Sequence, residues 1–219
     1  MKPKMFTRVT ASGLLCLGFI GYWTSVHKQP VHASGQCNAK CEKFSVDAKA
    51  SNPLQAVSLP PTQACTTRMS NGFPIPDPNC TPAAINPTLT ADVLRDPDFR
   101  TCCVRDNTTT AQEKATTYGW YTITHPRNNT GQSQTCELDH LVSLELGGAD
   151  TLDNIWPQCG PPGVSLPERF FKQKDMVENY LAKQVKEGKI DLGEAQKGIA
   201  NDWTQFLADA ERCKSGGCN

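Results

Sequence analysis

Eleven cysteines in 219 residues restrict the ways in which this chain can fold. Cys16 lies in an apolar stretch near the N-terminus. The other ten are Cys37, Cys41, Cys65, Cys80, Cys102, Cys103, Cys136, Cys159, Cys213 and Cys218. An even number of cysteines in an exported chain predicts disulfide bonds, up to five here, with a pairing that sequence alone leaves open. The alternative is zinc ligation, for example by Cys37 and Cys41 or by the cysteines at 136 and 159.

The N-terminus has the features of an export signal. Basic residues occur within the first eight positions, and an apolar run follows at 11–23. This run is shorter than the roughly 20 apolar residues that a membrane-spanning helix needs. Small residues precede a cleavage point after Ala33, which predicts a signal peptide at 1–33, with an uncleaved signal anchor as the alternative. We therefore expect a periplasmic or extracellular protein with no stable membrane association after cleavage.

Beyond the leader, composition divides the chain into three parts. Residues 34–76 are rich in Pro, Ser, Ala and Asn and predict an irregular arm pinned by its cysteines. A folded domain is expected at 77–213, followed by a tail at 214–219. Within the domain, the predicted elements are a short helix capped by Thr90, a helix at Thr110–Tyr118, a strand at 120–125, and two helices, from Pro167 to Gly188 and from Asp191 to Phe206. The last two carry apolar stripes that predict a packed helical hairpin.

Few residues are available to bind a metal through nitrogen. Once the leader is removed, the only histidines are His125 and His140. A metal site would therefore rest on oxygen ligands, which suit Mg²⁺ best here, with Mn²⁺ or Ca²⁺ as alternatives. We interpret His125 as a surface or structural residue. The net charge is zero, so any basic surface for nucleic acid must be local.

The stretch CELDHLVSLELGGADTLDNIWPQC, residues 136–159, combines an acidic residue with a histidine in an apolar run. Both side chains cost free energy when buried unless something pairs with them. ELDHLV and NIWPQ predict two strands joined by a glycine-containing loop, and the helix from Pro167 follows. The order strand, loop, strand, helix is that of a ββα-metal finger, and it predicts an α+β fold with a small ββα core, additional helices and disulfides.

This stretch resembles the HNH endonuclease superfamily. The resemblance rests on Asp139-His140, Gly147-Gly148, Asn154 and the run from Ile155 to Cys159. It is closest to a bacterial branch with DHLxxLELGG and NxWPQ, in which a helix carrying Lys-Asp-x-x-Glu follows; here that helix piece is 174–178. The similarity covers roughly residues 77–207 and is most specific in its central block.

The resemblance implies roles for individual residues. His140 is the general base that activates water, and Asp139 binds a divalent cation, provided that the strand is bent enough for both to face one site. Asn154 either orients the base or binds the metal. No histidine follows as a last metal ligand, so Asp175, Glu178 or water would take its place. Two further implications are that Lys174 neutralises the scissile phosphate and that a Cys136–Cys159 bridge replaces a structural zinc.

The expected activity is that of an exported, metal-dependent endonuclease. Its substrate would be DNA, with RNA as an alternative, cut with low sequence specificity. Arg169, Lys172 and Lys174 are the expected phosphate contacts. One alternative is a non-catalytic exported binding protein that keeps the finger as a scaffold, and another is a secreted nuclease toxin, which would need an immunity protein as partner.

Overall fold

The structure is a computed structural model that describes residues 41–105 and 110–217. These residues belong to one compact unit. The expected signal peptide, Cys37 and Cys218 lie outside the described residues. No helix in the described ranges has both the length and the apolar character that a membrane span requires.

Helices dominate the C-terminal half of the described chain. The α-helices are α2 (Ala91–Arg95), α3 (Thr110–Trp120), α4 (Phe170–Lys186), α5 (Leu192–Asp202) and α6 (Leu207–Arg212). Short 3₁₀ turns lie at Thr101–Cys103, Gly131–Ser133, Leu144–Leu146, Leu166–Glu168 and Trp203–Phe206. The long pair α4 and α5 corresponds to the helical hairpin that the sequence predicts.

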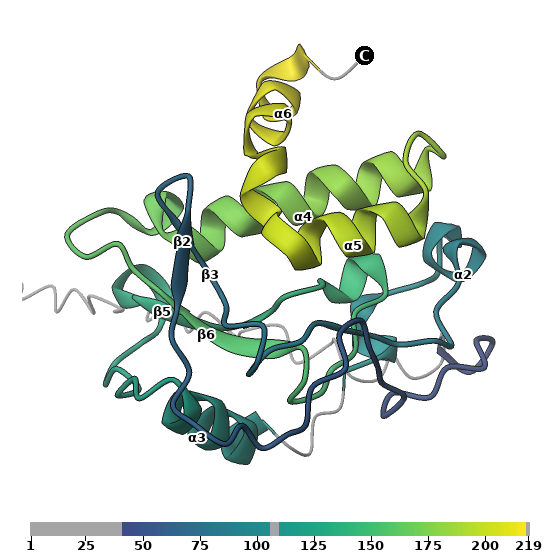
Figure 1. The fold of residues 1–219 in the computed structure, drawn as a ribbon. Coiled ribbons are helices and arrows are strands. Elements are labelled where there is room, and N and C mark those ends of the chain that lie inside the picture. The colour runs from purple at the N-terminus through teal and green to yellow at the C-terminus, as the bar shows by residue number, and fades with distance from the viewer. Residues whose placement is uncertain (1–40, 106–109, 218–219) are drawn as a thin grey trace, which may run out of the picture. The chain divides into compact units, whose positions relative to one another are not determined.

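The strands form separate antiparallel pairs. The pairs are β1 (Asn52–Pro53) with β4 (Ala84–Ile85), β2 (Arg68–Ser70) with β3 (Phe73–Ile75), and β5 (Cys136–His140) with β6 (Ile155–Cys159). In the last pair Cys136 lies opposite Cys159, and His140 lies opposite Ile155. Figure 1 shows α4 and α5 on one side of the β5–β6 hairpin and α3 on the other. The expected α+β class is confirmed.

Side-chain caps set the starts of two helices as predicted. The Thr90 side chain accepts a hydrogen bond from the backbone N–H of Val93 at the start of α2. Asp191 accepts from two backbone N–H groups at the start of α5. Gly188, at φ 71°, follows the end of α4 in a left-handed conformation that suits glycine. Local sequence therefore determines these helix ends.

The predicted strand at 120–125 is wrong. Trp120 is the last residue of α3, and a turn follows it. The side chain of Tyr121 is buried, and its hydroxyl lies 2.9 Å from the hydroxyl of Thr81. It also accepts a hydrogen bond from the N–H of Asp77. Tyr121 thus packs against the segment at 77–81, and no strand in the described chain pairs with this run.

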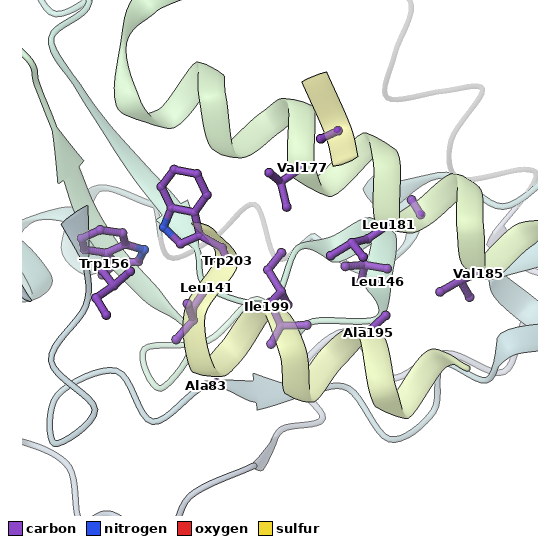
Figure 2. Packing of buried hydrophobic residues seen from close by; sticks show 14 of the residues in the cluster. Ala83, Leu141, Leu146, Trp156, Val177, Leu181, Val185, Ala195, Ile199 and Trp203 are labelled. Atoms are coloured by element: carbon purple, nitrogen blue, oxygen red, sulfur yellow. The ribbon is translucent and has the colours of Figure 1, made fainter. Parts of the chain in front are cut away.

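The main core lies where α4 and α5 meet the β5–β6 hairpin (Figure 2). Its largest fully buried members are Trp156, Trp203, Leu146, Leu181 and Ile199. The arm also contributes to this core, through Cys65 and Ile75 and through the carbonyl of Pro74, which accepts from Trp203 Nε1 at 3.0 Å. The arm, although mostly irregular, is therefore packed against the helices that support the hairpin.

Disulfide bonds tie the described chain together. The pairs are Cys41–Cys103, Cys65–Cys80 and Cys136–Cys159. Cys102 and Cys213 are also disulfide-bonded. The sulfurs at 41, 102 and 103 lie within 4.8 Å of one another, but bonded sulfurs offer no thiolate to zinc. The bonds indicate folding in an oxidising environment, as in exported proteins.

Candidate functional site

His140 is the last residue of β5 and is paired with a carboxylate that follows the double glycine. Its Nε2 lies 2.7 Å from Oδ1 of Asp150, and both side chains are largely buried. No other side-chain bond to His140 is present among the described residues. A carboxylate partner fixes the orientation of an imidazole and favours a proton on the nitrogen that faces it. The ring is therefore held in place with Nδ1 as its second functional atom.

Asp139 faces the other way, toward α4. Its Oδ2 lies 3.0 Å from Nζ of Lys174 and accepts from Nε1 of Trp156 at 3.0 Å. The Lys174 ammonium also contacts Glu178 and donates to the carbonyl of His140 at 2.6 Å. This ammonium thus lies among oxygens from β5 and α4. Because its side chain is fully buried, the prediction that Lys174 neutralises the scissile phosphate is wrong.

The buried charges around Lys174 perturb one another. Burial raises the pKa of Glu178 to about 8, although the nearby Lys174 opposes that rise. Burial likewise raises the pKa of Asp139, again against the ammonium. Burial lowers the pKa of Lys174 by less than its carboxylate partners raise it, so the group stays protonated. The single Lys174 ammonium is therefore the ion-pair partner of two buried carboxyl groups, those of Asp139 and Glu178.

A small acidic cavity of about 210 Å³ lies beside this cluster. Its acidic lining residues are Glu137, Asp139, Glu145, Asp175 and Glu178, and His140 also lines it. Arg105 is the only Lys or Arg among the described residues of that lining. Burial and the nearby Asp139 and Asp175 raise the pKa of Glu137 to about 6. Asp139 and His140 therefore line the same cavity, although their side chains bind different partners.

The carboxylates of the cavity do not form a closed cage for a cation among the described residues. In the described part of the chain, no three histidine or carboxylate ligand atoms lie within 4.8 Å of one another. Mg²⁺ is typically held by one or two carboxylates together with water and substrate phosphate, so it needs no closed cage. Glu137, Asp139 and Asp175 are the candidate ligands. The side chain of Asp175 is about one-third exposed and accepts from Lys172 at 2.6 Å.

Asn154 lies outside this cavity. Its Oδ1 accepts from the N–H groups of Val142 and Ala84, and its Nδ2 donates to the carbonyls of Val142 and Ala149 at 2.8 Å. An amide has two donors and two acceptor positions, and backbone takes all four. The prediction that Asn154 binds metal or orients His140 is therefore wrong. It fixes the loop between β5 and β6, and Asp150 orients the histidine.

Replacing Asn154 by alanine is expected to lower the free energy of unfolding by about 3 kcal/mol, because buried backbone groups lose their partners. Urea unfolding with the disulfides intact measures this loss. The matched control is Asn201→Ala on α5, where the side chain is exposed and the expected change is within about 0.5 kcal/mol. Equal losses of stability for the two variants would contradict the role of Asn154 in fixing the loop between β5 and β6.

The two glycines in the same loop have different roles. Gly147 has φ 74°, a left-handed conformation that glycine adopts without steric cost. Gly148 does not have a positive φ. A Cβ at that position would lie 1.8 Å from the carbonyl oxygen of Val142. Gly148 is required because the backbone turns closely past this carbonyl and past Asn154.

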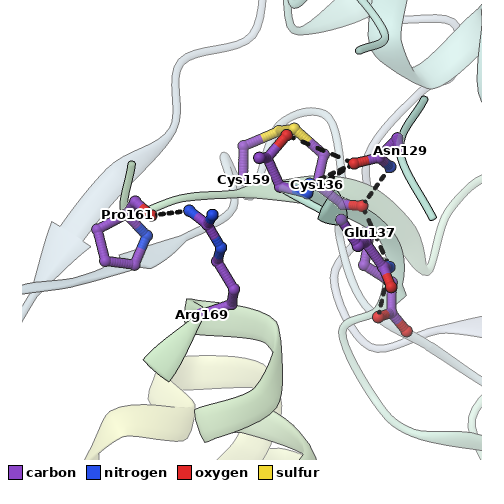
Figure 3. The surroundings of a disulfide bond; sticks show 8 residues. Asn129, Cys136, Glu137, Cys159, Pro161 and Arg169 are labelled. Atoms are coloured by element: carbon purple, nitrogen blue, oxygen red, sulfur yellow. Dashed lines mark hydrogen bonds between the residues drawn. A yellow bond between two sulfur atoms is a disulfide. The ribbon is translucent and has the colours of Figure 1, made fainter. Parts of the chain in front are cut away.

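The far end of the hairpin is closed covalently by the predicted Cys136–Cys159 disulfide (Figure 3). Asn129 supports it, since its Oδ1 accepts from the N–H of Cys136 at 3.0 Å and its Nδ2 donates to the carbonyl of Cys136 at 2.6 Å. Across the helix start, the buried Arg169 donates to the carbonyl of Pro161. Arg169 is thus a structural residue, and its expected role as a phosphate contact is wrong.

Comparison with protein-family models, curated proteins and solved structures gives no match. The assignment of chemistry to this site therefore rests on its residues and their geometry.

Three site residues were missed at the level of sequence. Asp150 carried a usable signal, because it directly follows the Gly-Gly-Ala turn that brings the loop back toward β5. Glu137 carried another, since it is two residues before Asp139 and shares its face of the strand. Arg105 carried none, because it comes to the cavity from the turn before α3, far away in sequence.

Proposed function

We propose that this protein is an exported, metal-dependent endonuclease that hydrolyses phosphodiester bonds in DNA or RNA. The observation that carries the proposal is the His140–Asp150 pair, with 2.7 Å between Nε2 and Oδ1, at an acidic cavity. The HNH-like motif that contains the pair, and the strand–loop–strand–helix order around it, support the same reading.

In this proposal His140 is the general base. A proton on Nε2, shared with Asp150, leaves the lone pair of Nδ1 to take a proton from water at neutral pH. The carboxylate then stabilises the imidazolium that forms. This assignment of the tautomer follows from the carboxylate partner.

The acidic cavity must be neutralised before a phosphodiester can approach. Glu137, Asp139 and Asp175 would hold a divalent cation, Mg²⁺ in the first instance. Such a cation, when bound, supplies Lewis-acid stabilisation of the phosphate and of the departing oxygen. Arg105 adds positive charge at the same cavity and takes the role once expected of Lys174. Lys174 instead holds Asp139 in position from α4.

The proposal is tested by incubating the purified, disulfide-bonded protein with supercoiled plasmid and with single-stranded DNA and RNA. We expect cleavage in Mg²⁺ or Mn²⁺, loss of cleavage in EDTA, and recovery when Mg²⁺ is added in excess, since the carboxylates alone repel phosphate. Gel electrophoresis measures the products. Intact substrates in both metals would contradict the proposal.

A non-catalytic binding protein is the second candidate. The observation that favours it is the Lys174 ammonium, which already satisfies Asp139 without any metal. This candidate predicts binding of nucleic acid without cleavage in either metal. The same gels, run beside a binding assay, separate the two functions.

A further inference from the structure

A second, wider cavity of about 860 Å³ adjoins the acidic one. The two share four lining residues, Arg105, Glu137, Leu138 and His140. The wider cavity, which we call the cleft, extends from β5 to the loop at 125–130 that follows α3. A molecule bound in the cleft therefore reaches His140 directly.

The cleft carries guanidinium groups that no described residue neutralises. Arg105 and Arg127 line it, and both are exposed. Neither makes an ion pair or a side-chain hydrogen bond with any described residue. The acidic residues of the cleft are Glu113, Glu137 and Asp150; Glu137 is shared with the acidic cavity, and Asp150 is bonded to His140. The outer part of the cleft is thus suited to phosphate, which arginine binds through several donors at once.

An aromatic ring lies beside these arginines. The imidazole of His125 is exposed on the cleft, and its ring centroid is 4.9 Å from that of the buried Tyr118 in an edge-to-face arrangement. This contact holds the imidazole in place while it remains open to solvent. A fixed, exposed ring offers a stacking surface for an unpaired base, which a closed duplex does not present.

Resting on the proposed nuclease function, we propose that the cleft binds a single-stranded segment of nucleic acid. Arg105 and Arg127 contact its phosphates, and His125 stacks on one of its bases. The strand then passes His140, where the acidic cavity receives the phosphate to be cut. Single-stranded DNA and single-stranded RNA share the chemistry that these groups bind.

Fluorescence anisotropy of a labelled 12-nucleotide strand tests this proposal, with the His140→Ala protein as the binding partner so that cleavage does not interfere. DNA and RNA versions of the strand and the matching DNA duplex are compared. We expect at least one single strand to bind more tightly than the duplex. Arg127→Ala should reduce the slope of log affinity against log salt by about 0.7, the value for one phosphate contact on a single strand.

Matched variants distinguish this site from general attraction. Arg212→Ala, which removes an exposed arginine on α6, should leave the salt slope unchanged. His125→Ala should weaken binding about fivefold, near the lower end for base stacking, and His125→Phe should restore it.

Equal affinity for strand and duplex, or equal slopes for Arg127→Ala and Arg212→Ala, would overturn the proposal and leave the nuclease function standing. Binding with these properties by a protein that cuts nothing would support the cleft while the nuclease function failed.

Discussion

His140→Ala is expected to slow phosphodiester cleavage by about 10²- to 10⁴-fold, the usual contribution of a positioned general base. The substitution removes the imidazole that Asp150 holds at 2.7 Å and leaves no other histidine at the acidic cavity. Initial rates on a labelled oligonucleotide in Mg²⁺ measure the loss. Thermal unfolding of both proteins checks that the variant keeps its fold.

Asp150→Asn is the matched variant for this prediction. The amide keeps the shape of the side chain but not its negative charge, so we expect a smaller loss of rate than for His140→Ala. Unchanged rates in both variants would show that the pair has no part in catalysis. A loss of rate together with a large loss of stability would instead assign the pair to the fold.

Lys174→Met should lower the free energy of unfolding by about 3–5 kcal/mol, because breaking a buried ion pair leaves an uncompensated charge. The lysine side chain is fully buried, and its ammonium lies 3.0 Å from Asp139 and in contact with Glu178. Methionine matches the length of the lysine stem, so the loss reports on charge more than on packing. Urea unfolding with the disulfides intact gives the measurement.

Lys172→Met, two residues earlier on the same helix, is the control. Its ammonium pairs with Asp175, but the side chain is about one-third exposed, so we expect a loss of about 0–1 kcal/mol. Equal stabilities for the two lysine variants would rule out the buried cluster as a source of stability.

The parts of the fold that sequence predicts are those set by local patterns. The β5–β6 hairpin follows from two apolar runs and a glycine turn, and α4 and α5 follow from helical spacing with Gly188 and Asp191 at their ends. The prediction of a strand at 120–125 is wrong because alternation of β-branched residues also occurs where a turn packs against a neighbouring segment. Tyr121 is held there by contacts with Asp77 and Thr81, which no local pattern reveals.

The site divides in the same way. Asp139 and His140 could be found because they are adjacent in an unusual dipeptide, and both line the cavity. The position of Lys174 depends on how deeply α4 packs against β5. From sequence its charge suggested a contact with phosphate, whereas in the structure its ammonium pairs with Asp139. Asn154 has a side chain that suits either a ligand or a backbone clamp, and only the closed loop distinguishes the two.

The bond between Cys136 and Cys159 makes a covalent ring of the residues between them. That ring contains Asp139, His140 and Asp150. A protease that cuts the peptide chain anywhere inside this ring would leave the two pieces joined. The two aspartates and the histidine would therefore stay connected. A single cut in this loop would therefore break one peptide bond and leave the candidate site residues covalently connected.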